Sequence, residues 1–342
     1  MKIAIITIRS RNFGNRLQNY ALQNVLEQNG YSVFTLKRET EQGGLKESVK
    51  TFIQKVLQTK GIKFKNFDKN IHFAREVVTR DNYPNNISKM YDYFIVGSDQ
   101  VWNPYYDFVA GKCDFLEFAN DDQKISYAAS FGVSEIPQDR EREYEKYLKT
   151  FKAISVRERQ GAKIVKELAD RDAIVVLDPT LMLGESEWKK VEKKTLYCPR
   201  NKYVFVYALG NKTDRFKRKI EQLSKTYKIL DVFAGGKKGK EMPIGPSEFL
   251  YLIRNAEIIL TDSFHATVFS ILYHKKFITF NRAGLNMNSR IESLAELVNQ
   301  GEHLNELGDF DCESGIDYRI VDEILKEERK KSCAFLKNAL EN

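Results

Sequence analysis

The sequence has few of the residues that cross-link or staple small folds. Among its 342 residues are four cysteines and four histidines, and no two cysteines form a CxxC pair. We therefore expect reduced thiols, with neither a disulfide framework nor a structural zinc site. No segment approaches the roughly 20 apolar residues that a membrane-spanning helix needs. The N-terminal apolar run Ile3–Ile8 is too short for a signal peptide and is followed by arginines, so we expect a cytoplasmic protein.

The two common glycine-rich phosphate loops are missing as well. The loop after the first apolar run, residues 9–18, contains Gly14 but matches neither GxGxxG nor GxxxxGKS/T. A dinucleotide-binding turn and a P-loop are therefore not indicated. The net charge of +8, from 55 basic and 47 acidic residues, suits an anionic partner. Since no RNA- or DNA-binding signature accompanies this charge, we expect no nucleic acid partner.

Short apolar runs alternate with helical stretches along the chain. This alternation predicts parallel sheets with helices on both faces, and 342 residues are enough for two domains. We predict an α/β protein of two Rossmann-like domains facing a cleft. The N-terminal domain is expected over residues 1–185 and the C-terminal domain over 200–315. A helical segment is expected over 316–342, and one option is that it packs back on the first domain. Strands are expected at residues 3–8, 31–36, 93–97, 124–129, 153–156, 173–177, 203–209, 228–233 and 257–261.

The segment TDSFHAT, residues 261–267, places a histidine where a strand turns into a helix. His265 falls in the first helical turn, where backbone N–H groups and the positive end of the helix dipole favour a phosphate. A histidine titrates near neutrality and can move a proton beside that phosphate. The other interpretation is a histidine packed at the turn, with Asp262 and Ser263 as ordinary caps. The residues alone leave both interpretations open.

Two further segments place polar residues directly after expected strands. In ISVRER, Arg157 can clamp a carboxylate or phosphate with two parallel hydrogen bonds; the alternative is a surface arginine paired with Glu158 or another carboxylate. In the first loop, Asn15 and Gln18 lie about one helical turn apart and can face the same ligand. The alternative there is an ordinary capped helix start.

The segment GSDQVWNP, residues 97–104, combines a polar cluster with one tryptophan. Ser98, Asp99 and Asn103 at the end of a strand, with the Trp102 indole as a stacking face, resemble a sugar-binding surface. Trp102 can equally be a buried anchor for the loop. The lysine-rich segment Lys46–Lys69 also carries interleaved aromatic residues. It predicts an amphipathic helix with a solvated lysine face, and a basic surface that contacts a membrane is compatible with it.

Six segments, taken in order, resemble the polysaccharide pyruvyl transferase family. They run in family order from about residue 3 to 282, which is most of the chain. The segments are GNRLQNYALQNVLEQNGYSV, DYFIVGSDQVWNP, KISYAASFG, ISVRERQG, VLDPTLML and EIILTDSFHATVFSILYHKKFITFNR.

The resemblance implies a fold similar to GT-B glycosyltransferases and a transferase without a required metal or cofactor. Family members typically move pyruvate from phosphoenolpyruvate onto two hydroxyls of a sugar, forming a cyclic ketal and releasing phosphate. For this chain it implies a cell-surface polysaccharide precursor as acceptor, as in exopolysaccharide or capsule biosynthesis, and a place at the inner face of the membrane fits that role. The family's catalytic histidine falls on His265 and its donor-binding arginine on Arg157.

The remaining expected site residues are assigned by their place in the two domains. We expect the acceptor sugar on the N-terminal side and the donor on the C-terminal side, with Arg290, Lys237 and Lys238 as further anion contacts. The expected substrate-binding residues are Asn15, Gln18, Ser98, Asp99, Trp102, Asn103, Asp262, Ser263 and Arg290. Two alternatives stay open: a GT-B glycosyltransferase that uses a nucleotide sugar, and a glycan-binding protein without catalysis.

Overall fold

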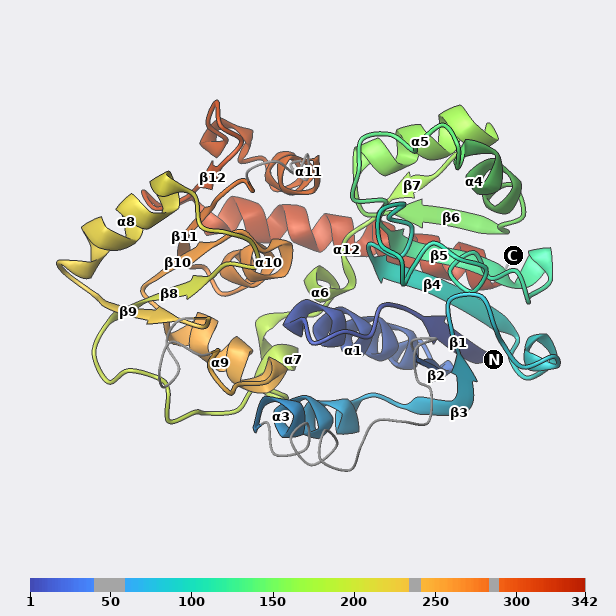
Figure 1. The fold of residues 1–342 in the computed structure, drawn as a ribbon, viewed down its shortest axis with the longest axis horizontal. Helices are drawn as coiled ribbons and strands as arrows, with labels where there is room; N and C mark the ends of the chain where they lie inside the picture. The colour runs from blue at the N-terminus through green and yellow to red at the C-terminus, as the bar shows by residue number, and fades with distance from the viewer. Residues whose placement is uncertain (40–58, 234–240, 283–288, 342) are drawn as a thin grey trace. The chain divides into compact units, whose positions relative to one another are not determined.

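The computed structural model describes residues 1–39, 59–233, 241–282 and 289–341. The chain divides into two compact units. Within the described ranges, the first unit comprises residues 1–39, 69–182 and 326–341, and the second comprises 59–68, 183–233, 241–282 and 289–325. Each unit is built around its own sheet (Figure 1).

The first unit is built on a parallel sheet of seven strands. Its strands follow the order β3-β2-β1-β4-β5-β6-β7, and each neighbouring pair is parallel. This is the strand order of a Rossmann fold extended by one strand. The strands are β1 (Lys2–Ile6), β2 (Ser32–Arg38), β3 (Phe73–Val78), β4 (Tyr93–Asp99), β5 (Lys124–Ala129), β6 (Ala153–Val156) and β7 (Ile174–Val175).

Helices cover both faces of this sheet because its central strands are apolar on both sides. In β1 the residues from Ile3 to Ile6 are almost completely buried. One face packs on α4 (Glu141–Leu148), α5 (Arg159–Ala169) and the loop after β4. On the other face α1 (Phe13–Gln28) contacts β2, and Phe335 of α12 (Tyr318–Glu341) packs on Tyr127 of β5.

The second unit has a five-stranded sheet in the order β12-β11-β10-β8-β9. Its pairs are parallel except for the short edge strand β12, which runs antiparallel to β11. The order corresponds to the flavodoxin-like arrangement, in which the first strand lies beside the third. The strands are β8 (Tyr203–Tyr207), β9 (Lys228–Asp231), β10 (Ile258–Thr261), β11 (Lys276–Thr279) and β12 (Phe310–Asp311).

Helices of the second unit also lie on both faces of their sheet. On one face Phe216 of α8 (Asp214–Ser224) stacks on Phe280 with ring centroids 4.2 Å apart. On the other face Phe249 of α9 (Pro246–Asn255) packs against Phe205, and α10 (Phe264–Leu272) contacts β10. The remaining α-helices of this unit are α3 (Thr59–Phe67), α7 (Glu185–Lys189) and α11 (Ser289–Leu297). The first unit also contains the short helix α6 (Pro179–Met182).

The division into units differs from the predicted domain boundaries most clearly at residues 59–68. Residues 59–68 belong to the second unit, although we predicted one N-terminal domain over residues 1–185. The physical reason is that α3 packs on α9: Lys63 forms a 2.5 Å ion pair with the buried Glu248, and Lys60 pairs with Glu241. Helix α12 begins in the second unit, and its part from Lys326 onward belongs to the first.

Only part of the lysine-rich segment lies within the described residues. Residues 46–58, including Lys50 and Lys55, lie outside them. In α3 the rings of Phe64 and Phe67 are buried, as an amphipathic helix requires. Contact of this segment with a membrane stays a prediction. Among the described residues no helix is both long and apolar enough to cross a membrane.

The four thiols differ in burial, which generates a test of the fold. Cys113 and Cys312 are fully buried, whereas Cys198 and Cys333 are partly exposed. Burial raises the pKa of Cys113 to about 12, and burial also raises the pKa of Cys312. Since the thiolate is the reactive form, iodoacetamide at pH 8 should label Cys198 first and spare Cys113 and Cys312 until the protein unfolds. Mass spectrometry of tryptic peptides checks this order, and early labelling of Cys113 would contradict the described core.

Candidate active site

The predicted polar residues gather at the carboxyl ends of the strands. In open α/β sheets ligands bind there, at the crevice where the strand order reverses. In the first unit this crevice lies between β1 and β4, and in the second between β8 and β10. Asn15 and Gln18 lie on the helix after β1, Ser98 and Asp99 are the last two residues of β4, and His265 follows β10.

Gln18 connects the ends of β1 and β4. Its side-chain amide donates to Thr7 Oγ1 at 2.7 Å and accepts from the backbone N–H of Ser98 at 3.1 Å. Thr7 in turn donates to the carbonyl of Ser98 at 3.1 Å. Because Gln18 is completely buried, it joins the two strand ends and is not presented to a ligand. This corrects our expectation that it binds substrate directly.

Asn15 and Asp99 form the outer edge of the same cluster. The Asn15 amide donates to the Asp99 carboxylate, and Ser10 donates to the Asn15 oxygen. Helix α1 starts here, since Asn12 caps it by accepting from the backbone N–H of Gly14 at 2.9 Å. Asp99 has a left-handed backbone (φ 72°), and its side chain is 12% exposed. The Asp99 carboxylate is therefore the partly accessible acidic group of this cluster.

A glycine is required where β4 approaches β5. Gly97 has φ 120°, and a Cβ at this position would lie 2.2 Å from the carbonyl oxygen of Tyr127. Any side chain would push the strands apart. The close approach lets Ser98 turn inward, where its hydroxyl donates to Asp178 at 2.7 Å.

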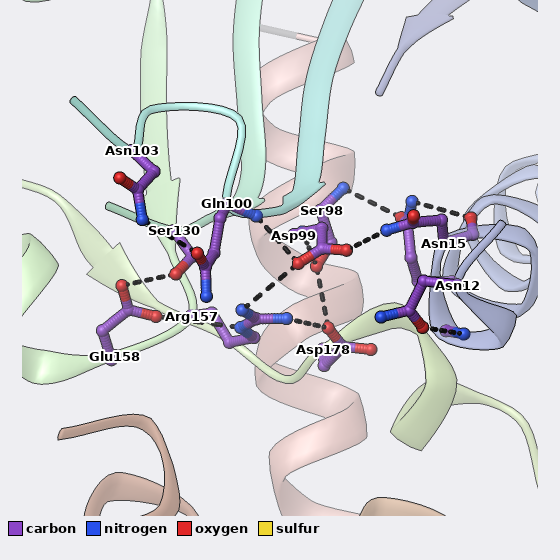
Figure 2. Close-up of polar contacts among 12 residues, drawn as sticks. Asn12, Asn15, Ser98, Asp99, Gln100, Asn103, Ser130, Arg157, Glu158 and Asp178 are labelled. Atoms are coloured by element: carbon purple, nitrogen blue, oxygen red, sulfur yellow. Dashed lines mark hydrogen bonds and ion pairs between the residues drawn. The ribbon is translucent and has the colours of Figure 1, made fainter. Parts of the chain in front are cut away.

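Arg157 lies at the centre of a buried ionic cluster (Figure 2). Its guanidinium donates to Asp178 at 3.0 Å and lies 3.8 Å from Asp99 and 3.7 Å from Glu158. Glu158 also accepts from Ser130 at 2.8 Å. Burial by itself lowers the pKa of Arg157, but Asp178, Asp99 and Glu158 outweigh it and hold that pKa above its ordinary value.

In this environment Arg157 is not an open clamp for an anion, and its role as a donor contact stays a prediction. Its side chain is 2% exposed and lies among three acidic side chains. An approaching phosphate or carboxylate would meet that negative charge first. Neither is Arg157 the surface residue of the alternative interpretation. In this structure it is an internal counter-ion that holds Asp99 in place.

The side chains of Trp102 and Asn103 stabilise the loop after β4. The Trp102 side chain is completely buried, donates to the carbonyl of Asp114 at 2.9 Å, and packs against Phe115, Phe131 and Phe151. Trp102 is therefore a buried anchor for the loop, the second of the two interpretations of this residue, and its indole offers no face to a sugar. Asn103 is buried and donates to Gln100 at 2.9 Å.

In the second unit Asp262 organises the crevice. Its carboxylate accepts from the backbone N–H groups of Leu209 at 2.7 Å and Gly210 at 2.8 Å, and from Arg282 Nε at 2.9 Å. It thereby joins the loop after β8 to the residue that follows β11. Asp262 therefore anchors these groups, and it also lines a small open pocket.

The N-terminus of α10 is fixed between three strands. Ser263 is its N-cap; the Ser263 N–H donates to Thr261 Oγ1 at 3.0 Å, and its carbonyl accepts from Thr267 at 3.0 Å. Thr267 also shares a 2.6 Å hydrogen bond with Thr279 of β11. His265 is the second residue of the helix and is 6% exposed. The predicted strand, turn and helix around His265 are therefore confirmed.

Two arginines line the pocket beside this helix terminus. The residues around it are Asp262, Phe264, Thr279, Phe280, Asn281, Arg282, Arg290, Ile291 and Gly308. Arg290 is thus placed with Asp262, as expected, whereas Lys237 and Lys238 lie outside the described residues. Among the residues that the structure describes, no group of three His, Cys, Asp or Glu side chains is suited to hold a metal ion.

Arg282, Glu158 and Asp178 are site residues that sequence reasoning missed. Arg282 ends the last segment that resembles the family and lies three residues after β11, a strand that was not predicted. Asp178 directly follows the expected strand at residues 173–177, and Glu158 was named only as a pairing partner of Arg157. The importance of both arises from burial next to Arg157, which the sequence does not show.

Residues 12–284 match the family described as Polysaccharide pyruvyl transferase. The chain belongs to the polysaccharide pyruvyl transferase family. The match includes both crevices, from Asn15 to Asp262 and His265. The family is one of transferases and supports a pyruvyl transferase activity for this chain. A search of curated proteins finds no match.

Solved structures share the fold at low sequence identity. A putative UDP-N-acetylglucosamine 2-epimerase from Listeria monocytogenes is similar with a TM-score of 0.53 and 11% identity, over 95% of this chain and 94% of the other. The UDP-GlcNAc 2-epimerase from Methanocaldococcus jannaschii has a TM-score of 0.51 and 13% identity, over 96% and 100%. UGT89C1 from Arabidopsis thaliana, complexed with UDP-L-rhamnose, has 0.51 and 9%, over 99% and 98%. The fold is therefore α/β of the GT-B type.

The buried position of Arg157 generates a stability prediction. Arg157→Met removes the counter-ion of three acidic side chains and should lower the free energy of unfolding by about 3–5 kcal/mol. Urea denaturation at pH 7 measures this change. Arg319→Met is the matched control, since its 91%-exposed side chain pairs with Asp317 at the surface and should give no measurable change. Equal stability of the two variants would contradict the internal role of Arg157.

Proposed function

We propose that the chain transfers pyruvate from phosphoenolpyruvate onto two hydroxyls of a sugar in a cell-surface polysaccharide precursor. The products of this reaction are a cyclic ketal and inorganic phosphate, and no cofactor takes part. The observation that carries the proposal is the position of His265. It lies in the first turn of α10, at the crevice between β8 and β10, within a chain of the pyruvyl transferase family.

The surroundings of His265 suit an anionic donor. The first turn of a helix presents backbone N–H groups and a positive dipole end to a phosphate or carboxylate. Arg282 and Arg290 line the pocket next to Phe264, the residue that precedes His265. We assign the phosphate or carboxylate of phosphoenolpyruvate to these two guanidinium groups. Arg157, which the family resemblance suggested for this role, lies among three acidic side chains, and we propose that it positions Asp99 instead.

The first unit suits the neutral acceptor. Its cluster contains three acidic side chains and several amides and hydroxyls, which can bind sugar hydroxyls but would repel a phosphate. We assign the acceptor to this unit, with the partly exposed Asp99 as the group that accepts a hydroxyl proton. Ser98 and Asn15 support Asp99 through their hydrogen bonds.

The proposed chemistry needs one acid and one base. Protonated His265 gives its proton to C3 of phosphoenolpyruvate, which leaves C2 electrophilic. The first sugar hydroxyl forms a bond to C2 and loses its proton to a base. The second hydroxyl then forms another bond to C2 while the C2–O bond to phosphate breaks. One proton enters at C3 and two leave the hydroxyls. One of these two replaces the proton that His265 gave, and the departing phosphate takes up the other and leaves as hydrogen phosphate.

A nucleotide-sugar glycosyltransferase is the competing function. The fold is shared with a protein whose structure contains UDP-L-rhamnose, so a GT-B chain can hold such a donor. The two functions differ in their donor. Pyruvyl transfer predicts acceptor-dependent release of phosphate from phosphoenolpyruvate, whereas the alternative predicts tight binding of a nucleoside diphosphate.

Replacement of His265 tests the proposed acid. His265→Gln should lower kcat for acceptor-dependent phosphate release by about 10²–10⁴-fold, the usual contribution of a general acid. His72→Gln is the matched control, because this histidine is largely exposed and pairs with Glu27; its activity should not change. Full activity of the His265 variant would exclude the catalytic role of this residue.

Replacement of Arg290 tests the donor contact separately. Arg290→Met should raise the KM for phosphoenolpyruvate about tenfold, a change that corresponds to one lost charged hydrogen bond. The KM for the acceptor and the melting temperature should stay close to those of the parent protein. An unchanged KM for phosphoenolpyruvate would remove Arg290 from the donor site.

A further inference from the structure

The loop after β4 exposes aromatic rings next to the polar cluster of the first unit. Tyr105 is 68% exposed and Phe108 is 45% exposed. The ring of Tyr106 stacks on that of Phe108, with centroids 5.4 Å apart and ring planes within 11°. Exposed aromatic rings on one short loop are costly to keep in water and are typical of a binding surface. We call Tyr105, Tyr106 and Phe108 the aromatic platform.

Two arginines donate hydrogen bonds to the backbone carbonyls of this loop. Arg38 donates to the carbonyl of Phe108 at 2.5 Å, and Arg140 donates to the carbonyls of Pro104 at 3.0 Å and Ala110 at 2.9 Å. Arg38 is itself fixed by a two-pronged ion pair with the buried Asp114. The loop is therefore preorganised although its aromatic rings face solvent.

The loop is closed at its base and sits on the core. The N–H of Ala110 donates to the carbonyl of Val101 at 3.0 Å, and the buried Trp102 lies between these two residues in the chain. Tyr144 reaches the carbonyl of Trp102 with its hydroxyl at 2.9 Å. Rigid support beneath exposed rings is what a binding platform requires.

A chain of hydrogen bonds links the aromatic platform to Asp99. The N–H of Tyr105 donates to the Asn103 oxygen at 2.9 Å, and the Asn103 amide donates to Gln100 at 2.9 Å. The Gln100 N–H then donates to Asp99 at 2.9 Å. Figure 2 shows Asn103 and Gln100 on the loop that follows β4, beside Asp99. The positions of Tyr105 and Asp99 are thus coupled through a few bonded groups.

The charge of the loop indicates which class of ligand the aromatic platform can bind. Residues 101–111 contain no lysine or arginine, and their single charged residue is Asp107. Anionic lipids and nucleic acids need basic groups that this loop lacks. A neutral sugar chain fits, because a pyranose offers C–H faces to aromatic rings and hydroxyls to tyrosine.

From these observations we infer that the aromatic platform binds a neutral hexopyranose unit of the acceptor glycan, next to the unit whose hydroxyls reach Asp99. The inference rests on the proposed function for the identity of the glycan as an acceptor. The binding itself involves no donor and no catalysis, so it can be measured separately.

The test is sugar binding by the full chain without phosphoenolpyruvate. Saturation-transfer NMR is recorded with a panel of neutral gluco-, galacto- and manno-oligosaccharides. We expect signals from pyranose C–H protons with at least one of them, and an affinity about tenfold weaker for Tyr105→Ala/Phe108→Ala, as expected when stacking contacts are lost. Tyr105→Phe should keep most of the affinity because it keeps the ring.

The matched control is Tyr197→Ala, which removes a 40%-exposed aromatic ring from the second unit and should leave the affinity unchanged. No binding of any oligosaccharide, or equal binding by the double variant, would overturn the inference. Dissociation of an oligomer by the double variant in sedimentation would also overturn it, since the rings would then face a second copy. Ring-dependent sugar binding without phosphate release would keep the platform and reject the phosphoenolpyruvate part of the proposed function.

Discussion

Two buried aspartates hold the ends of the parallel strands in place, one in each unit. Asp178 collects hydrogen bonds from Ser98, Arg157 and Thr180, and Asp262 collects them from the loop after β8 and from Arg282. A buried carboxylate is stable only when its oxygens accept such bonds. Both aspartates therefore fix the loops around them, and the crevices of the two sheets are rigid because of this constraint.

The charged groups at the two crevices differ, and this difference supports the proposed division between acceptor and donor. In the first unit one guanidinium lies among Asp99, Glu158 and Asp178. In the second unit the helix α10 terminus lies beside Arg282 and Arg290. A hydroxyl-rich neutral sugar suits the acidic crevice, and a phosphorylated carboxylate suits the basic one. Ketal transfer from phosphoenolpyruvate needs this combination of ligands.

Much of the fold follows from local patterns in the sequence. The strands at residues 124–129 and 153–156 are observed at their predicted bounds, because alternating small and apolar residues end in polar ones there. The strands β3, β11 and β12 were not predicted; β12 has only two residues, too few for any pattern. Helix α9 begins after Gly245, which has no side chain to cap it, and Glu248 instead accepts from the Gly245 N–H at 3.0 Å.

The place of the candidate site residues in the fold was predictable, and their surroundings were less so. Residues after strands were found correctly, because parallel strands bring their carboxyl ends to one edge. What each side chain does there depends on burial, which no local pattern reveals. Trp102 and Arg157 were expected to meet ligands, yet both are buried, and the exposed aromatic rings are those of Tyr105 and Phe108.

The central claim is that His265 protonates C3 of phosphoenolpyruvate, and isotope incorporation during turnover tests it most directly. The reaction is run in D₂O with an acceptor glycan, and the methyl group of the ketal is examined by mass spectrometry and NMR. The account predicts one solvent deuterium in that methyl group, and loss of product with His265→Gln. A ketal methyl group without deuterium, or an equal yield of labelled ketal from the variant, would contradict it.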